Sequence, residues 1–70
     1  MAQQCRVVSG IDNQLLWAMD LRERYGLYHL TIKQVLRKWR RHSDNYAACW
    51  MAPTIDSVES VFGVKLEACN

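Results

Sequence analysis

The clearest hydrophobic pattern of the chain lies in the segment "TIKQVLRKWRRH", residues 31–42. Its apolar residues recur at i, i+3, i+4 and i+7 and are Ile32, Val35, Leu36 and Trp39. This spacing places all four on one stripe of a helix. The hydroxyl of Thr31 is suited to cap the helix N-terminus. The pattern predicts an amphipathic helix over 31–42 that buries its apolar stripe and turns its charges to solvent.

Two continuations of this helix are compatible with the sequence. Ser43, Tyr46 and Trp50 keep the phase of the apolar stripe, so the helix could run on to Met51. The stretch "HSDN" instead favours a break, with Ser43 capping a separate short helix. We expect a kink or break near Ser43, and a separate helix there would make four in all.

Helical spacing also marks a segment on the N-terminal side. The apolar positions of 11–25 that share one face are Ile11, Leu15, Ala18, Met19, Leu21 or the stem of Arg22, and Tyr25. Asp12 or Ser9 can cap the start of this helix. Gly26 can close it in the left-handed conformation.

A third helix is predicted over 54–62. Pro53 ends the preceding element, Thr54 is a suitable cap, and Asp56 in the first turn complements the helix dipole. The apolar face consists of Ile55, Val58, Val61 and Phe62, and Gly63 follows it. We expect Val58 and Phe62 to share one core with Ile32, Val35, Leu36 and Trp39.

Both ends of the chain favour β structure. "CRVV" (5–8) is a short β-leaning run, and "VKLEA" (64–68) alternates apolar and polar residues. An antiparallel ribbon of these two segments would hold the termini together. The expected fold class is therefore mainly α: a small bundle of three helices, or four in the alternative, with a short two-stranded ribbon.

Length and composition narrow the class of protein. Seventy residues form one small domain, 1–70, that buries only about 60% of its unfolded surface. Half of the residues are apolar and three are tryptophan, which argues against disorder. No run approaches the roughly 20 apolar residues of a membrane span, and the N-terminus lacks the pattern of a secretory signal. We therefore expect a cytoplasmic protein with no membrane partner.

Three cysteines, an odd number, are first interpreted as reduced thiols. Cys49 lies beside Trp50 in an apolar run, so we expect it to be buried and unpaired. A bridge between Cys5 and Cys69 is the alternative, because the two ends could pair.

Charge is divided unevenly along the chain. Residues 1–43 carry eight Lys or Arg against three Asp or Glu, a net of +5, whereas residues 44–70 carry one Lys against four acidic residues, a net of −3. The overall net charge is +2. This asymmetry indicates a positive side that can attract phosphate groups or an acidic protein surface.

Catalytic and metal-binding patterns find little support in the sequence. It contains no Gly-rich phosphate loop and no GxSxG, and neither His29 nor His42 belongs to a nucleophile signature. The cysteines and histidines show no C-x-x-C or H-x-x-x-H spacing. We expect no enzyme activity, no cofactor and no metal.

The stretch "LRERYGLYHLTIKQVLRKWRR" (21–41) resembles the helix-turn-helix of the DNA-binding superfamily. The matching features are a turn glycine (Gly26), an apolar residue after it (Leu27), and apolar residues six and nine positions past the glycine (Ile32 and Val35). Two positions differ from the pattern. Arg22 stands four before the glycine, where a small residue is preferred, and Leu30 occupies a place that is more often polar.

The resemblance implies a small regulatory protein, active in transcription, whose second helix enters the major groove. It places Lys33, Gln34 and Arg37 against base edges and Lys38, Arg40 and Arg41 against phosphates. Tyr28 and His29, in the turn, would contact the DNA backbone. A palindromic site would require a homodimer, and the sequence shows no dimer seam that can be separated from the core.

A protein-binding module, such as an inhibitor or adaptor of a host protein encoded by a phage or mobile element, is the alternative function. It rests on large apolar side chains in excess of what a thin core can bury: Trp17, Tyr28, Tyr46, Trp50 and Met51. The partner would be an acidic host protein surface. An unbroken positive face on the second helix would favour nucleic acid, and a contiguous aromatic patch would favour a protein.

Overall fold

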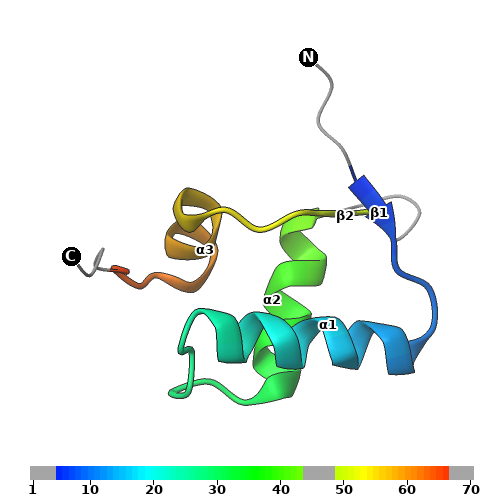
Figure 1. The fold of residues 1–70 in the computed structure, drawn as a ribbon, viewed down its shortest axis with the longest axis horizontal. Helices are drawn as coiled ribbons and strands as arrows, with labels where there is room; N and C mark the ends of the chain where they lie inside the picture. The colour runs from blue at the N-terminus through cyan, green and yellow to red at the C-terminus, as the bar shows by residue number, and fades with distance from the viewer. Residues whose placement is uncertain (1–4, 44–48, 67–70) are drawn as a thin grey trace.

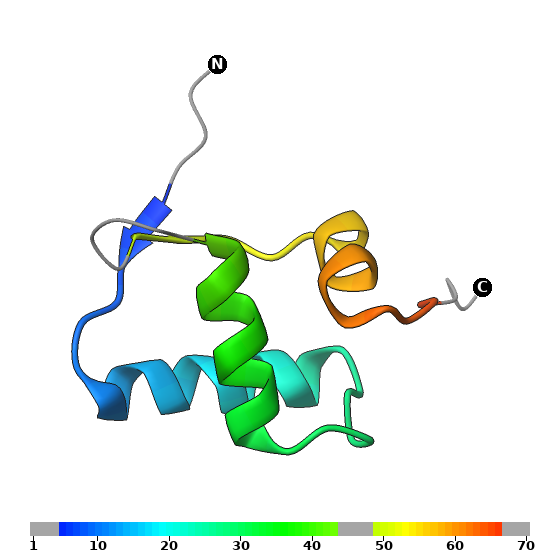
Figure 2. The same cartoon turned by 180° about the vertical axis from the view of Figure 1, so that it is seen from behind.

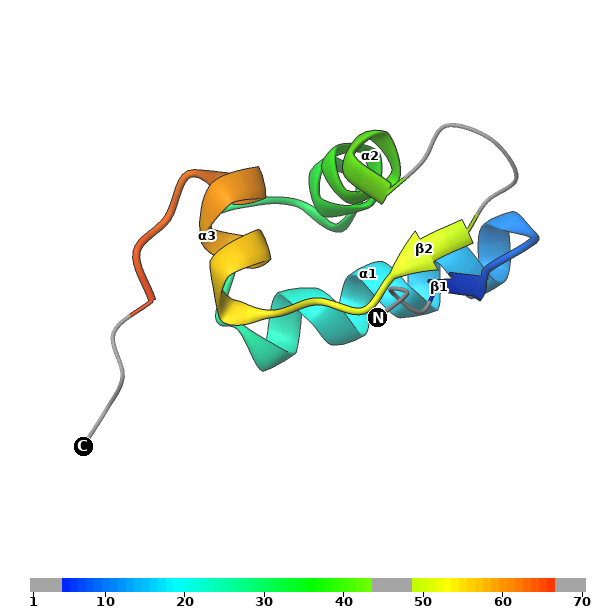
Figure 3. The same ribbon diagram turned by 90° about the horizontal axis from the view of Figure 1, so that it is seen from above.

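The structure of the chain is a computed structural model that describes residues 5–43 and 49–66, and for Cys5 the backbone alone. The elements in chain order are β1 (Cys5–Val7), α1 (Ile11–Arg24), α2 (Ile32–Ser43), β2 (Cys49–Met51) and α3 (Ile55–Phe62). Figure 1 shows α1 running beneath the β1–β2 ribbon, α2 crossing behind α1, and α3 beside α2 on the side remote from β1. Seen from above, α1 and α2 form two layers (Figure 3). The predicted mainly α fold with three helices and a short ribbon is confirmed.

Local chemistry explains where α1 ends. Gly26 adopts a left-handed conformation with φ of 64°, and the N–H of Leu27 donates to the carbonyl of Arg22 at 2.9 Å. Together with a longer bond from Gly26 N–H to the Glu23 carbonyl at 3.4 Å, this is a Schellman arrangement. The expected closure at Gly26 is confirmed. The expected cap by Asp12 or Ser9 at the start of α1 is wrong, because the N-cap residue is Gly10 and no side-chain cap hydrogen bond forms.

The start of α3 carries a reciprocal cap. The hydroxyl of Thr54 accepts from the Ser57 N–H at 3.1 Å, and the Ser57 hydroxyl accepts from the Thr54 N–H at 2.8 Å. Gly63 closes the helix with φ of 65°. These contacts confirm the cap and the stop that the sequence predicts for this helix.

The ribbon differs from expectation in its second strand. β1 pairs with β2 in antiparallel register, with Arg6 opposite Trp50, whereas residues 64–66 are not a strand. The N–H of Leu66 donates instead to a carboxylate oxygen of Glu59 at 2.7 Å, so a side chain of α3 holds this backbone. Residues 67–68 of the expected C-terminal strand lie outside the described residues.

α2 ends at Ser43, where the sequence favours a break. A helix continuing to Met51 is wrong for residues 49–51, which form β2. Strand pairing with β1 takes precedence over helical phase here, because it supplies backbone hydrogen bonds while Trp50 still enters the core. The residues between, including Tyr46, lie outside the described part.

Trp39 is the largest side chain of the core that α2 contributes. It is fully buried, and its ring stacks on Phe62 of α3 with centroids 6.1 Å apart. Val35, Leu36 and Val58 are buried in the same cluster and Ile32 packs at its edge. The predicted shared core is therefore confirmed.

Trp50 anchors the ribbon to the helices. It too is fully buried, and the ring of Trp17 meets it edge to face at 5.6 Å. On α1, Ala18 and Leu21 are buried. Ile11 and Met19, which share the expected apolar face, are 58% and 42% exposed. The buried side of α1 is therefore narrower than the sequence pattern predicts.

Cys49 corrects a further expectation. It is half-buried and disulfide-bonded rather than buried and unpaired. Cys49 alternates with the buried Trp50 along β2, so its side chain lies on the strand face away from the core, which explains its partial exposure. Cys69 and the side chain of Cys5 lie outside what the structure describes.

Replacing Trp39 with Ala should lower the free energy of unfolding by about 3–5 kcal/mol, because it removes the ring that joins α2 to α3 and leaves a cavity. Denaturant or thermal unfolding measures the loss. Lys38→Ala, a neighbouring exposed change, should stay within about 0.5 kcal/mol of the parent protein. A Trp39→Ala protein with an unchanged melting temperature would contradict this core.

Candidate nucleic-acid interface

The side chains of α2 divide into an inner and an outer face. Val35, Leu36 and Trp39 are buried, and every Lys and Arg of the helix is exposed. At 3.6 residues per turn, the positions nearest to the point opposite the buried stripe are Gln34, Arg37 and Arg41. Lys33 and Lys38 lie on either side of this row, and Arg40 lies further toward one flank. Figure 2 shows α2 in front of α1, so this face looks away from the rest of the fold.

The only full charges on the outer face of α2 are positive. α2 carries five Lys or Arg residues and no Asp or Glu. Within the described ranges the one ion pair joins Arg24 to Asp20 at 3.1 Å, both on α1. None of the α2 cations is therefore neutralised by an acid that the structure describes, and all of them are available to an anionic partner.

Gln34 has a structural contact that the sequence interpretation did not give it. Its side-chain oxygen accepts from the Thr31 N–H at 2.8 Å, while the Thr31 hydroxyl accepts from the Gln34 N–H at 3.1 Å. This is a reciprocal cap at the start of α2, and it confirms Thr31 as the capping residue. In this arrangement the Gln34 oxygen is already bonded, and the base-reading role predicted for Gln34 would require it to leave the cap.

The connection between α1 and α2, residues 25–31, positions the two turn residues predicted to contact DNA. It is seven residues long, whereas the helix-turn-helix connection has three or four. Tyr28 is 61% exposed, and the Arg22 guanidinium lies 5.1 Å from the centre of its ring. His29 is also exposed. Both predicted residues are therefore accessible beside the start of α2.

Arg22 is the residue that sequence reasoning missed. Its side chain donates from Nε to the Leu30 carbonyl at 2.7 Å and at the same time covers the Tyr28 ring. It therefore joins the end of α1 to the residue before the α2 cap. The available signal was its position four residues before Gly26, where the motif prefers a small side chain.

The aromatic patch of the alternative function is not assembled in the described part of the chain. Trp50 is fully buried and Trp17 is half-buried against it. Tyr28 is exposed in the turn, and Met51 is half-buried in β2. Tyr46 lies outside the described residues. The contiguous aromatic patch that would favour a protein partner is therefore absent among the described residues.

No protein-family model, curated protein sequence or solved structure matches this chain. Among the described residues, no three His, Cys, Asp or Glu side chains gather closely enough to hold a metal ion. None of the helices described there has both the length and the apolar character needed to cross a bilayer. The case for function therefore rests on the geometry of α2 and the charges it carries.

Replacing Thr31 with Ala should cost about 0.5–2 kcal/mol of unfolding free energy, because it removes one half of the reciprocal cap. Thr31→Ser keeps the hydroxyl and should retain most of the stability. Chemical denaturation of the two variants beside the parent protein provides the comparison. Equal losses in both would show that the hydroxyl bond does not stabilise α2.

Proposed function

We propose that the protein binds double-stranded DNA through the outer face of α2 and acts as a small regulatory protein of helix-turn-helix type. The observation that carries this proposal is the exposed face of α2, which bears five cations and no acid and has no described acid paired to it. An α-helix fits the major groove, and positive side chains along it release counterions from the phosphates. A cytoplasmic location is part of this proposal.

The phase of α2 suggests how its side chains divide the task. Gln34, Arg37 and Arg41 form the outermost row, which extends about 10 Å along the helix axis at 1.5 Å per residue. That length corresponds to about three base pairs. In a major-groove complex this row would face base edges, and the arginines would bind guanine O6 and N7 through two hydrogen bonds.

The residues beside this row would neutralise phosphates. Lys33 and Lys38 lie on opposite sides of it and Arg40 lies beyond Lys33, so the three would meet the two strands that border the groove. Tyr28 and His29 would contact the backbone near the start of α2. This assignment differs from the sequence interpretation in moving Arg41 to the bases and Lys33 to the phosphates.

The alternative partner, an acidic surface of a host protein, would use the same basic face. An inhibitor or adaptor of this kind draws support from the charge of α2 alone, because Trp50 is buried and the aromatic anchors do not form a patch. DNA is favoured because a helix with five cations and no acid matches a regular array of phosphates. A homodimer would be needed for a palindromic site.

The affinity for a duplex of about 16 base pairs should fall steeply between 50 and 200 mM salt. The log–log slope is expected to be about −0.9 for each phosphate neutralised. Replacing Lys33, Lys38 and Arg40 together with Ala should flatten the slope by about 0.9 per lost contact and weaken binding to all sequences alike. Fluorescence anisotropy with a labelled duplex measures both effects.

Lys65→Ala is the matched control for a single charge loss, because Lys65 is exposed and lies outside α2. It should change affinity far less than Lys38→Ala, although both lower the net charge by one. Equal effects of the two would show that binding follows net charge and not the α2 face. No binding even at the lowest salt concentration would contradict the proposed function.

Arg37→Lys should alter which sequence is preferred. The substitution keeps the positive charge but loses the planar fork that bonds both guanine acceptors. We expect discrimination at one base pair to fall by about 1–3 kcal/mol, with the salt slope unchanged. Selection from a randomised duplex pool, sequenced for the parent and the variant, tests this. An identical preferred sequence in both proteins would remove Arg37 from base recognition.

A further inference from the structure

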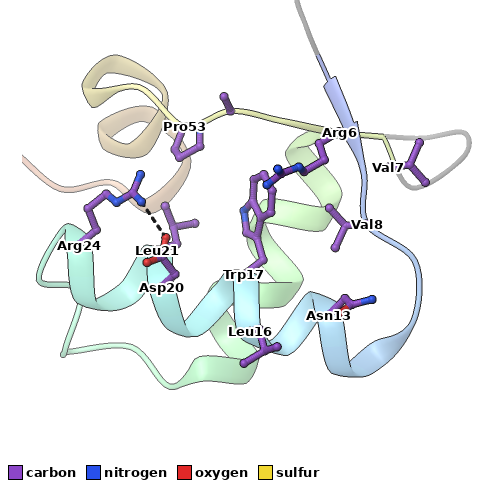
Figure 4. Close-up of a pocket in the computed structure, with 11 residues that line it drawn as sticks. Arg6, Val7, Val8, Asn13, Leu16, Trp17, Asp20, Leu21, Arg24 and Pro53 are labelled. Atoms are coloured by element: carbon purple, nitrogen blue, oxygen red, sulfur yellow. Dashed lines mark ion pairs between the residues drawn. The ribbon is translucent and has the colours of Figure 1, made fainter.

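A groove of about 550 Å³ lies between α1, β1 and the segment that follows β2. Figure 4 shows it on the side of α1 that faces the ribbon, with α2 behind. No residue of α2 lines it, so it is separate from the proposed DNA-binding face. Its volume falls within the range of about 300–1,000 Å³ found for small-molecule sites.

Trp17 forms a rigid apolar wall of the groove. Its ring meets Trp50 edge to face at 5.6 Å, with an angle of 85° between the ring planes. Because Trp50 is fully buried, this contact fixes the indole of Trp17 while leaving it half-exposed. Figure 4 shows the ring standing up from α1 toward the ribbon. A fixed, partly exposed indole offers a flat surface to an aromatic ring.

Two large apolar side chains at the groove are exposed and do not pack in the core. Val7 is 66% exposed and Leu16 is 62% exposed, and both line the groove. Exposed valine and leucine at the edge of a concave site lower the free energy of binding an apolar ligand, because they leave water when it binds. Such a ligand would lie against Trp17, with Val7 and Leu16 at the outer rim of the groove, where Figure 4 shows both side chains pointing away from the Trp17 ring.

The charges of the groove select an anion. Arg6 and Arg24 both line it, but Arg24 is paired with Asp20 at 3.1 Å. Arg6 has no acidic partner among residues 5–43 and 49–66. Its position opposite Trp50 in the ribbon places its side chain on the ribbon face that looks toward α1. Figure 4 shows it extending from β1 toward Trp17.

We propose that this groove binds a small aromatic molecule that carries one anionic group, a carboxylate or sulfonate. The aromatic ring lies against Trp17, and the guanidinium of Arg6 binds the anion in its planar fork. The Arg24–Asp20 pair adds no net charge to the groove, which leaves Arg6 as the charge that binds the anion. The groove then gives the protein a ligand site on a different side from the α2 face.

Two dyes of nearly the same shape test this site. The anionic probe 1-anilinonaphthalene-8-sulfonate and the neutral probe N-phenyl-1-naphthylamine differ only in the sulfonate. We expect the native protein to bind the anionic dye at one site, with an affinity about tenfold or more above that for the neutral dye, since a charge-assisted bond to arginine contributes at least this factor. Fluorescence titration measures both affinities.

Three variants separate the groove from the basic helix. Arg6→Ala should weaken binding of the anionic dye about tenfold and leave the neutral dye nearly unchanged. Leu16→Glu, an exposed change that adds a negative charge at the edge of the groove, should also weaken the anionic dye. Arg37→Ala on α2 is the matched control and should leave both affinities unchanged. In ¹⁵N-labelled protein, the Trp17 indole N–H signal should shift with saturation.

The proposal is overturned by any of three results: equal affinities for the two dyes, an Arg6→Ala protein that binds like the parent, or shifts confined to α2 amides. The last result would mean that the dye binds the cations of α2 and not the groove. The outcome does not depend on DNA binding, since the titrations contain no DNA. A protein that fails to bind duplex DNA can still bind the anionic dye. Likewise, a protein that fails to bind the dye can still bind duplex DNA.

Discussion

Burial of Trp39 fixes the orientation of α2, and the candidate interface depends on that orientation. The ring stacks on Phe62 and is wholly removed from solvent. In a helix, fixing one side chain fixes the direction of all the others at 100° per residue. With Trp39 turned inward, Arg37 and Arg41 must point away from the core. Stability and the positive outer face are therefore two consequences of the same packing.

The helix α1 packs against α2 on one side and borders the groove around Trp17 on another. Its buried residues Ala18 and Leu21 belong to the core shared with α2, while Asp12, Asp20 and Glu23 are exposed. Among residues 1–43, all three acids therefore lie on α1 and five of the eight cations lie on α2. This distribution concentrates positive potential on α2 without a large net charge. The opposite side of α1 meets the ribbon and forms the groove around Trp17.

The turn between the helices depends on Arg22. Its bond to the Leu30 carbonyl and its contact with Tyr28 join the end of α1 to the start of α2. A small residue at this position would allow closer helix packing and a shorter turn. The present chain has a seven-residue connection that the long side chain spans. The departure from the helix-turn-helix pattern at Arg22 therefore corresponds to the longer connection between α1 and α2.

The helices could be predicted from sequence because their signals are local. Thr54 and Gly63 bound α3, Gly26 closes α1, and the stripe of α2 repeats at helical spacing. The reciprocal cap of Gln34 could also have been predicted, since Thr31 and Gln34 are spaced as a capping box requires. The sequence contained that signal, but the residue was interpreted only as a DNA contact.

The ribbon could not be predicted in full because strand pairing is non-local. The sequence patterns pointed to residues 64–68 as the partner of β1, whereas Trp50 in the true partner kept the phase of the α2 stripe and indicated a helix. Which segment pairs is decided by where Trp50 can be buried, against Trp17, and not by alternation along the strand. The position of Arg6 beside Trp17 depends on the same pairing. The groove therefore could not be predicted from the sequence patterns.

Chemical-shift mapping with a short DNA duplex tests the central claim most directly. Backbone amide and arginine Nε–H signals of ¹⁵N-labelled protein would be followed while a 16-base-pair duplex is added at low salt. The account predicts that the largest changes fall on Lys33, Arg37 and Arg41 and on the turn at Tyr28, while signals of Arg6 and Leu16 in the groove change little. Changes centred on the groove, or no changes at all, would contradict a DNA-binding face on α2.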